Sequence, residues 1–87
     1  MVTFDYTIKD PMGLHARPVG IMVKAATPFK TTKVTVAHNG ASVDGKRMFA
    51  LLGLQVRQGD TITITAEGEN EQEVVAAIQS VFAAENL

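Results

Sequence analysis

Apolar and polar residues alternate along three stretches of the chain. A period of two is typical of a β-strand with one face buried and the other in water. Asn39-Gly40 follows the second stretch and favours a two-residue hairpin turn, so residues 41–44 are expected to return antiparallel as a further strand. The three alternating stretches are residues 2–8, 33–36 and 61–66.

The stretch after Pro18 has the periodicity of an amphipathic helix instead. Its apolar residues recur at i, i+3, i+4 and i+7, which places them on one face. Pro18 marks the start, because proline is tolerated in the first turn, where its missing N–H needs no partner. His15 is then the expected N-cap, and Leu14 and Val19 take positions that often pack together across the first turn. The expected buried face consists of Val19, Met22, Val23 and Ala26.

A second helix is expected to begin at residues 44–47 and to extend through about Leu54. Its composition is unusually apolar. If Leu51 and Leu54 face the core, its other large side chains cannot all be buried, and an exposed apolar patch commonly marks a binding surface. The alternative is a helix between two layers, or a phase shifted by one residue. The candidates for exposure are Met48, Phe49 and Leu52, together with Ile21 on the preceding helix.

The third helix is expected to start after Asn70, because Asn70 and Glu73 resemble a capping box. The resulting order, β-α-β-β-α-β-α, predicts an α+β fold with a four-stranded antiparallel sheet and three helices on one face. The other face, rich in Thr and Lys, is left to water. We expect residues 1–87 to form one domain. The apolar stripe of the third helix comprises Val74, Ile78, Val81 and Phe82.

Composition and charge narrow the classes of function. The net charge of -1 argues against general nucleic-acid binding, and the absence of cysteine excludes disulfides and thiolate metal sites. No stretch resembles a signal peptide or is long enough to span a bilayer, so we expect a cytoplasmic protein. Basic residues in the first two helices would attract an acidic partner, unless they are ordinary solvated side chains. They are Arg17, Lys24, Lys46 and Arg47.

His15 is the candidate for chemistry. A helix N-terminus offers unpaired backbone N–H groups and about half a positive charge, which together favour an anion. Arg17 adds a fixed cation whose forked donors suit phosphate oxygens. Histidine is a poor N-cap by propensity, so a nucleophilic ring at such a place suggests a transient phosphoryl acceptor. The alternative is a histidine that only caps the helix and faces water.

Other chemistries lack the residues they need. A hydrolase triad would require a nucleophile and an orienting acid, and the residues around His15 supply neither. A metal site would need partners, but His38 is the only other histidine and no ligand spacing joins the two. His38 is interpreted as a surface residue before the hairpin turn. The chain also lacks the phosphate-binding loop and the dinucleotide fingerprint.

Residues 13–18 form the run Gly13-Leu14-His15-Ala16-Arg17-Pro18. This six-residue run resembles the active-site motif of the HPr family, the histidine-containing phosphocarriers of the bacterial phosphotransferase system. The resemblance extends over the whole chain in length and element order, and the family fold is an open-faced β-sandwich. It implies that the Nδ1 atom of His15 accepts a phosphoryl group from phospho-enzyme I and passes it to IIA domains of sugar permeases.

The same resemblance implies a carrier that is not itself an enzyme and needs no cofactor or metal. Arg17 and the Ala16 backbone N–H would contact the phosphoryl group. The first two helices would dock both donors and acceptors, and the protein is expected to be a monomer that binds neither nucleic acid nor membrane. The docking residues implied are Ile21, Lys24, Arg47, Met48, Phe49 and Leu52.

Two alternatives remain open from the sequence. One is a paralogue that serves a nitrogen-regulatory or single-sugar branch, and the other is a regulatory module that binds a transcription factor. The chain also departs from many HPr proteins, which have a regulatory serine at the start of the second helix. Arg47 takes that place, and residues 43–56 contain neither Ser nor Thr. We therefore expect no serine-kinase control at this helix.

Overall fold

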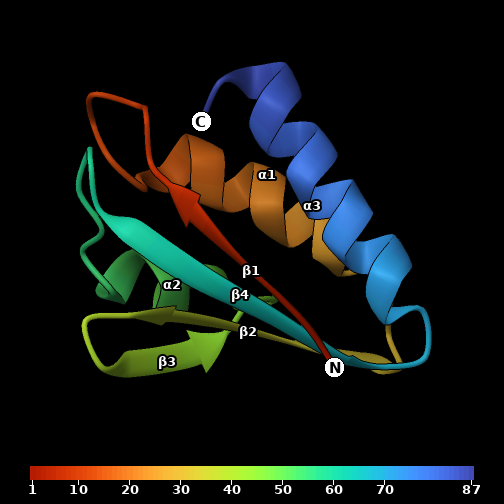
Figure 1. Cartoon of the computed structure of the whole chain (residues 1–87). Helices are drawn as coiled ribbons and strands as arrows, with labels where there is room; N and C mark the ends of the chain where they lie inside the picture. Colours follow the sequence, from red (N-terminus) through yellow and green to blue (C-terminus); the bar gives the residue numbers. More distant parts are fainter.

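The computed structural model describes all 87 residues. Four strands form one antiparallel sheet in the order β1-β4-β2-β3, and three helices cover one face of it, as the sequence predicts (Figure 1). The strands are β1 (Val2–Thr7), β2 (Thr32–His38), β3 (Ala41–Asp44) and β4 (Thr61–Gly68). The helices are α1 (Ala16–Ala26), α2 (Met48–Gly53) and α3 (Glu71–Glu85).

The alternating pattern of the strands becomes the two faces of the sheet. Ile64 of β4 lies opposite Phe4 of β1 and Val36 of β2, and Ile64 and Val36 are fully buried beneath the helices. On the opposite face, Thr7 and Thr61 meet side by side with their hydroxyl oxygens 3.0 Å apart. The predicted division into an apolar face and an open polar face is confirmed.

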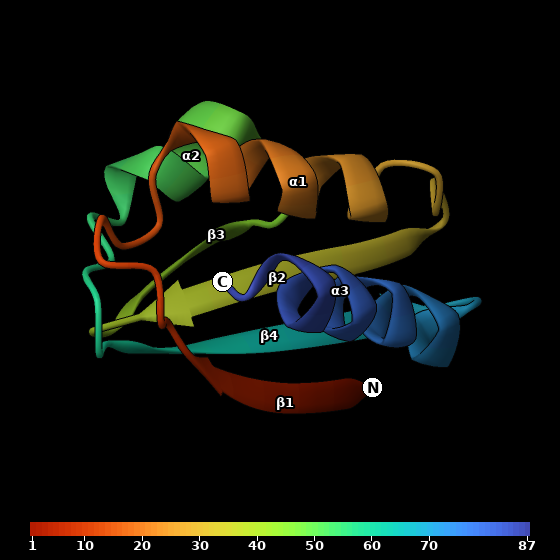
Figure 2. The same ribbon diagram turned by 90° about the horizontal axis from the view of Figure 1, so that it is seen from above.

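The helices form a single layer in which α1 lies between α2 and α3 (Figure 2). The expected buried face of α1 holds at Val19, Met22 and Ala26, whereas Val23 is only partly buried and Pro18 is buried instead. In α3, Val81 is likewise only partly buried and Val75 takes its place in the core. The apolar periodicity indicates one buried face for each helix but does not fix the centre of that face.

Helix α2 is shorter than expected and begins at Met48. The reason lies in the preceding turn, where the Asp44 Oδ1 atom accepts the Lys46 N–H at 2.9 Å and the Asp44 carbonyl accepts the Arg47 N–H at 3.2 Å. Aspartate favours this kind of turn because its side chain accepts a nearby backbone N–H in a non-helical conformation.

The capping box expected at α3 is absent. Asn70 adopts a left-handed conformation with φ 60°, and its side chain makes no capping hydrogen bond. Glu71 contacts this bend instead, because its carboxylate accepts the Gly68 N–H at 3.2 Å and the amine of Met1 at 2.9 Å. These two donors, the amine first, hold the pKa of Glu71 below its usual range.

The interpretation of His38 as a surface residue is wrong. Its side chain is 7% exposed, and its Nε2 atom lies 2.9 Å from Oδ2 of Asp60. The alternation along β2 accounts for this burial. The strand extends to His38, and every second residue from Thr32 onward faces the helices. The Arg57 N–H and then the His38 ring hold the pKa of the Asp60 carboxyl below its usual range.

Candidate functional site

His15 is the N-cap of α1, as predicted. Its backbone is extended, with φ -92° and ψ -172°, and its side chain makes no capping hydrogen bond to the helix. The helix is anchored without the ring, because the Val19 N–H donates to the His15 carbonyl at 3.0 Å and Leu14 and Val19 are both buried. The imidazole is therefore available at the helix N-terminus, with 28% of its side chain exposed.

Gly13 sets the path of the loop that leads to His15. Its φ of +70° belongs to the left-handed region, and a Cβ atom there would lie 2.4 Å from the Val56 carbonyl oxygen. The next residue uses the same carbonyl, which accepts the Leu14 N–H at 3.0 Å. Glycine is required because it permits both the conformation and the close backbone approach. The loop is thus held against the segment between α2 and β4.

Asp10 contacts the ring of His15, and the sequence reasoning did not include it. Its Oδ2 atom lies 3.1 Å from Nε2 of His15, and its Oδ1 atom accepts the Met12 N–H at 2.9 Å. The Met12 N–H and then the His15 ring hold the pKa of the Asp10 carboxyl below its usual range. The Asp10-Pro11 pair indicates a turn in the sequence but does not predict a contact with His15. That contact arises from the bend of the loop at Gly13.

Arg17 lies one residue inside the helix start, and its guanidinium forms an ion pair with the carboxylate of Glu85 at the end of α3. More than half of its side chain, 59%, remains exposed. Such an exposed pair contributes only about 0.2–1 kcal/mol, so an arriving anion can compete for the guanidinium. No sequence signal pointed to Glu85, because the contact arises from the packing of α3 beside α1.

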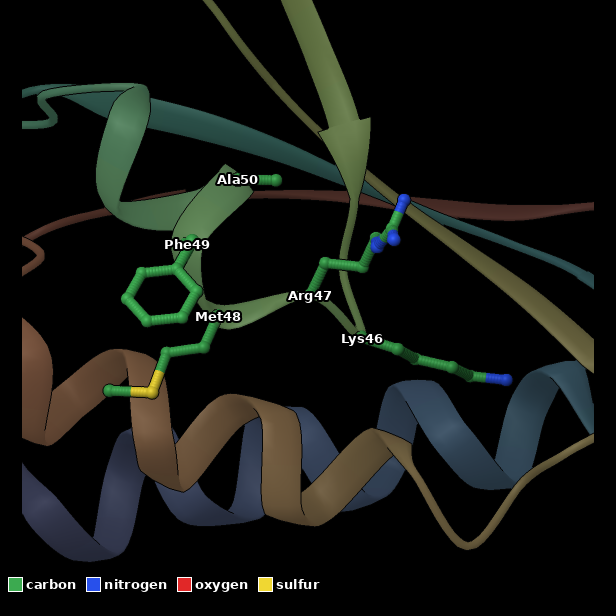
Figure 3. Close-up of a pocket in the computed structure, with 5 residues that line it drawn as sticks. All are labelled: Lys46, Arg47, Met48, Phe49 and Ala50. Carbon is green, nitrogen blue, oxygen red and sulfur yellow. The ribbon is translucent and has the colours of Figure 1, made fainter.

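The start of α2 presents the expected apolar side chains. Phe49 is 86% exposed and Met48 is 37% exposed. Figure 3 shows the two side chains pointing to one side, while Lys46 and Arg47 point to the other. The Lys46 ammonium is not free, because it donates to the backbone carbonyls of Phe29 and Thr32. Arg47 is exposed and has no ion-pair partner, so its guanidinium is the cation at this end that is free to meet a partner.

The remaining predicted docking residues divide between two places. Ile21 and Lys24 line a groove between α1 and α3, together with Val81 and Glu85. Arg47, Met48 and Phe49 line a separate hollow at the start of α2. Leu52 is half-buried in α2. The two helices are neighbours, so these residues belong to adjoining surfaces of one layer rather than to one pocket.

The site contains a nucleophilic ring, a carboxylate that contacts it, and a guanidinium near a helix N-terminus. Such a set can hold an anion and accept a group on the ring nitrogen that the carboxylate leaves free. No three His, Cys, Asp or Glu side chains come close enough together to hold a metal ion. No helix has both the length and the apolar character needed to cross a membrane.

The fold and the site define a class of protein. It is an open-faced β-sandwich, an antiparallel sheet with helices on one face, that presents a partly exposed histidine at a helix N-terminus. A sequence model described as the PTS HPr component phosphorylation site, where PTS is the phosphotransferase system, matches residues 2–84. The chain belongs to the HPr family of phosphocarrier proteins.

Relatives agree in sequence and in structure. The phosphocarrier protein HPr of Mycoplasma genitalium is 41% identical over 80 residues, which cover 92% of this chain and 91% of that protein. An HPr structure from Thermoanaerobacter tengcongensis has 30% identity and a TM-score of 0.89, covering 97% of this chain and 93% of that one. A histidine-containing phosphocarrier protein from Mycoplasma has 27% identity and a TM-score of 0.92, covering 97% and 94%.

Proposed function

We propose that this protein carries a phosphoryl group on His15, which it accepts from phospho-enzyme I and passes to the IIA domains of sugar permeases. The observation that supports this most directly is the position of His15. It is an N-cap whose ring makes no capping bond and stays partly exposed. The protein acts as substrate and carrier, and enzyme I acts as the enzyme.

The surroundings of His15 suit a group that must leave again. The N-terminus of α1, including the Ala16 N–H, stabilises an anion by about 0.3–1 kcal/mol, and a charged hydrogen bond from Arg17 adds about 1.5–3 kcal/mol. Arg17 would exchange Glu85 for phosphoryl oxygens. These energies hold the phosphoryl group without trapping it. We propose Nδ1 of His15 as the acceptor atom.

We propose that partners dock on α1 and α2 around Ile21, Met48, Phe49 and Leu52, with Lys24 and Arg47 at the rim. Exposed apolar side chains beside free cations fit a partner with an apolar centre and an acidic border. We further propose that the chain acts in the cytoplasm as a monomeric single domain. A paralogue of a nitrogen-regulatory or single-sugar branch would share this chemistry and differ only in its enzyme I.

The test is phosphorylation with labelled phosphoenolpyruvate and each candidate enzyme I. Wild type should take up one phosphoryl group per chain, and His15→Ala should take up none. His38→Gln is the matched control and should be labelled like wild type, since His38 lies at the end of β2. A circular dichroism melt checks that each variant is folded. Label retained by His15→Ala would refute the assignment, and a wild type that no enzyme I labels would favour a regulatory binding module.

A further inference from the structure

Asp10 is fixed in space by both of its carboxylate oxygens. Oδ1 accepts the Met12 N–H at 2.9 Å, and Oδ2 faces Nε2 of His15 at 3.1 Å. The Asp10 side chain is 18% exposed. A carboxylate with each oxygen engaged by a different partner has a defined plane, so the atom that it presents to the ring is also defined.

The backbone keeps Asp10 at this distance from His15. The Lys9 and Asp10 N–H groups both donate to a backbone oxygen of Leu87, at 2.6 and 3.0 Å, and Leu87 is 1% exposed. On the other side of the loop, the Leu14 N–H donates to the Val56 carbonyl. Backbone hydrogen bonds therefore anchor the loop at both ends. Asp10 and His15 face each other across this anchored loop.

The contact determines which ring nitrogen carries the proton. An ionised carboxylate has no donor and can only accept a hydrogen bond. The Met12 N–H lowers the pKa of the Asp10 carboxyl, and an aspartate with an ordinary pKa is already ionised at neutral pH. A neutral imidazole that bonds to it through Nε2 must have its proton on Nε2. Its lone pair is then on Nδ1, because the neutral ring has one donor and one acceptor nitrogen.

We infer that Asp10 is a positioning residue that holds His15 in the tautomer with a proton on Nε2 and a free lone pair on Nδ1. The inference rests on the proposed function, and it names the group that prepares the acceptor atom. Nothing in the contact requires Asp10 to touch the phosphoryl group.

The transfer step balances with this assignment. The Nδ1 lone pair forms the new bond to phosphorus, and the bond between phosphorus and the donor atom breaks with its electron pair left on the donor. The Nε2 proton stays in place, so the phosphorylated ring has a positive charge, which the Asp10 carboxylate stabilises through the same hydrogen bond. Return of the phosphoryl group to an acceptor leaves the ring neutral and ready for another cycle.

The test is the tautomer of His15, read from nitrogen NMR spectra of the ring at about pH 8.5, where an imidazole is neutral. No phosphoryl donor is present. Wild type should show the proton on Nε2. In Asp10→Asn the amide oxygen can still accept the Met12 N–H, but the amide nitrogen then faces Nε2 as a donor. The ratio of the tautomer protonated on Nδ1 to the tautomer protonated on Nε2 should therefore rise severalfold.

Asp44→Asn is the matched control, because the Asp44 Oδ1 atom accepts the Lys46 N–H at 2.9 Å in the same kind of turn, and no histidine ring bonds to Asp44. It removes the same charge and should leave the tautomer of His15 unchanged. A wild-type ring protonated mainly on Nδ1, or a tautomer that Asp10→Asn does not alter, would overturn the inference. The wild-type spectrum decides this even if Asp10→Asn fails to fold.

The rate of phosphoryl transfer is the second measurement. Asp10→Asn should accept the phosphoryl group at least about tenfold more slowly than wild type, with the same final stoichiometry and a similar melting temperature. Equal rates would overturn the positioning role. If no enzyme I labels wild type, the proposed function fails, whereas the spectra still decide whether Asp10 sets the tautomer.

Discussion

Phe49 and Phe82 show how differently one residue type can be used in this chain. Phe82 of α3 is 1% exposed and contacts both aromatic rings of β1, Phe4 and Tyr6. Phe49 of α2 is 86% exposed. A large apolar side chain left in water contributes little to folding and is available to a partner. Substituting Phe82 therefore tests the contribution of an aromatic ring to stability, and substituting Phe49 tests its contribution to docking.

We expect Phe49→Ala to weaken binding of enzyme I by about 2 kcal/mol or more if the ring is a hot spot. Its cost in unfolding free energy should stay well below the roughly 3–5 kcal/mol of a buried Phe deletion. Calorimetric titration and denaturant unfolding measure the two effects. Phe82→Ala is the control and should lose stability by that larger amount. Unchanged affinity of Phe49→Ala for enzyme I would place docking elsewhere.

At the scale of elements, the pattern predicted every strand and helix but not where the residues of different elements meet. The hairpin at Asn39-Gly40 is confirmed, with φ 49° and 82°, because this dipeptide by itself favours the turn. His15 is confirmed as an N-cap because Pro18 fixes the helix start. The side chains that contact His15 and Arg17 could not be predicted from the sequence. Asp10 reaches the ring through a bent loop, and Glu85 reaches Arg17 through the packing of α3 on α1.

The start of α2 has a positive charge at the place where the resemblance to the HPr family implies a regulatory serine. Arg47 is the N-cap of α2 and makes no side-chain capping bond. A cation at a helix N-terminus opposes the helix dipole by about 0.3–1 kcal/mol. The exposed guanidinium attracts an acidic partner instead, mainly through the rate of association. We predict that docking at α2 is not switched off by serine phosphorylation.

Arg47→Glu should slow phosphoryl transfer from enzyme I, most clearly at low salt, where charge attraction between surfaces is least screened. Transfer rates across a salt series measure this effect. Lys33→Glu is the control, because it reverses the same charge on the exposed side of β2 and should transfer like wild type. Wild type treated with an HPr serine kinase and ATP should gain no phosphate by mass spectrometry. Equal rates at low salt, or stoichiometric serine phosphate, would contradict this prediction.

At the scale of the whole molecule, Asp60 joins three segments. Its backbone carbonyl accepts the Ile8 N–H at 2.9 Å, and its Oδ2 atom accepts the Arg57 N–H at 3.1 Å and contacts the ring of His38. The ends of β1 and β2 and the loop before β4 are thus held by one residue. Because the folded protein lowers the pKa of Asp60 from its ordinary 3.8, the ionised form stabilises the fold.

This stabilisation is fully present above the unfolded pKa of about 4 and is lost as pH falls through the lower folded pKa. Melting temperatures measured from neutral pH down to about pH 2 should therefore decline. Asp60→Asn should melt lower at neutral pH and decline less steeply. Part of the slope should remain, because Asp10 and Glu71 also have lowered pKa values. Asp5→Asn, on the open face, is the control, and an Asp60→Asn slope identical to that of wild type would contradict the prediction.

The hydrogen bonds at Leu87 allow the opening of the loop that carries Asp10 to be measured by amide exchange. The Lys9 and Asp10 amides both donate to a backbone oxygen of this buried residue, beyond the end of α3. Protected amides exchange with deuterium only when their partner moves away. The exchange rates of these two amides therefore record how often the C-terminal segment detaches, and each detachment also frees the loop that carries Asp10 toward His15.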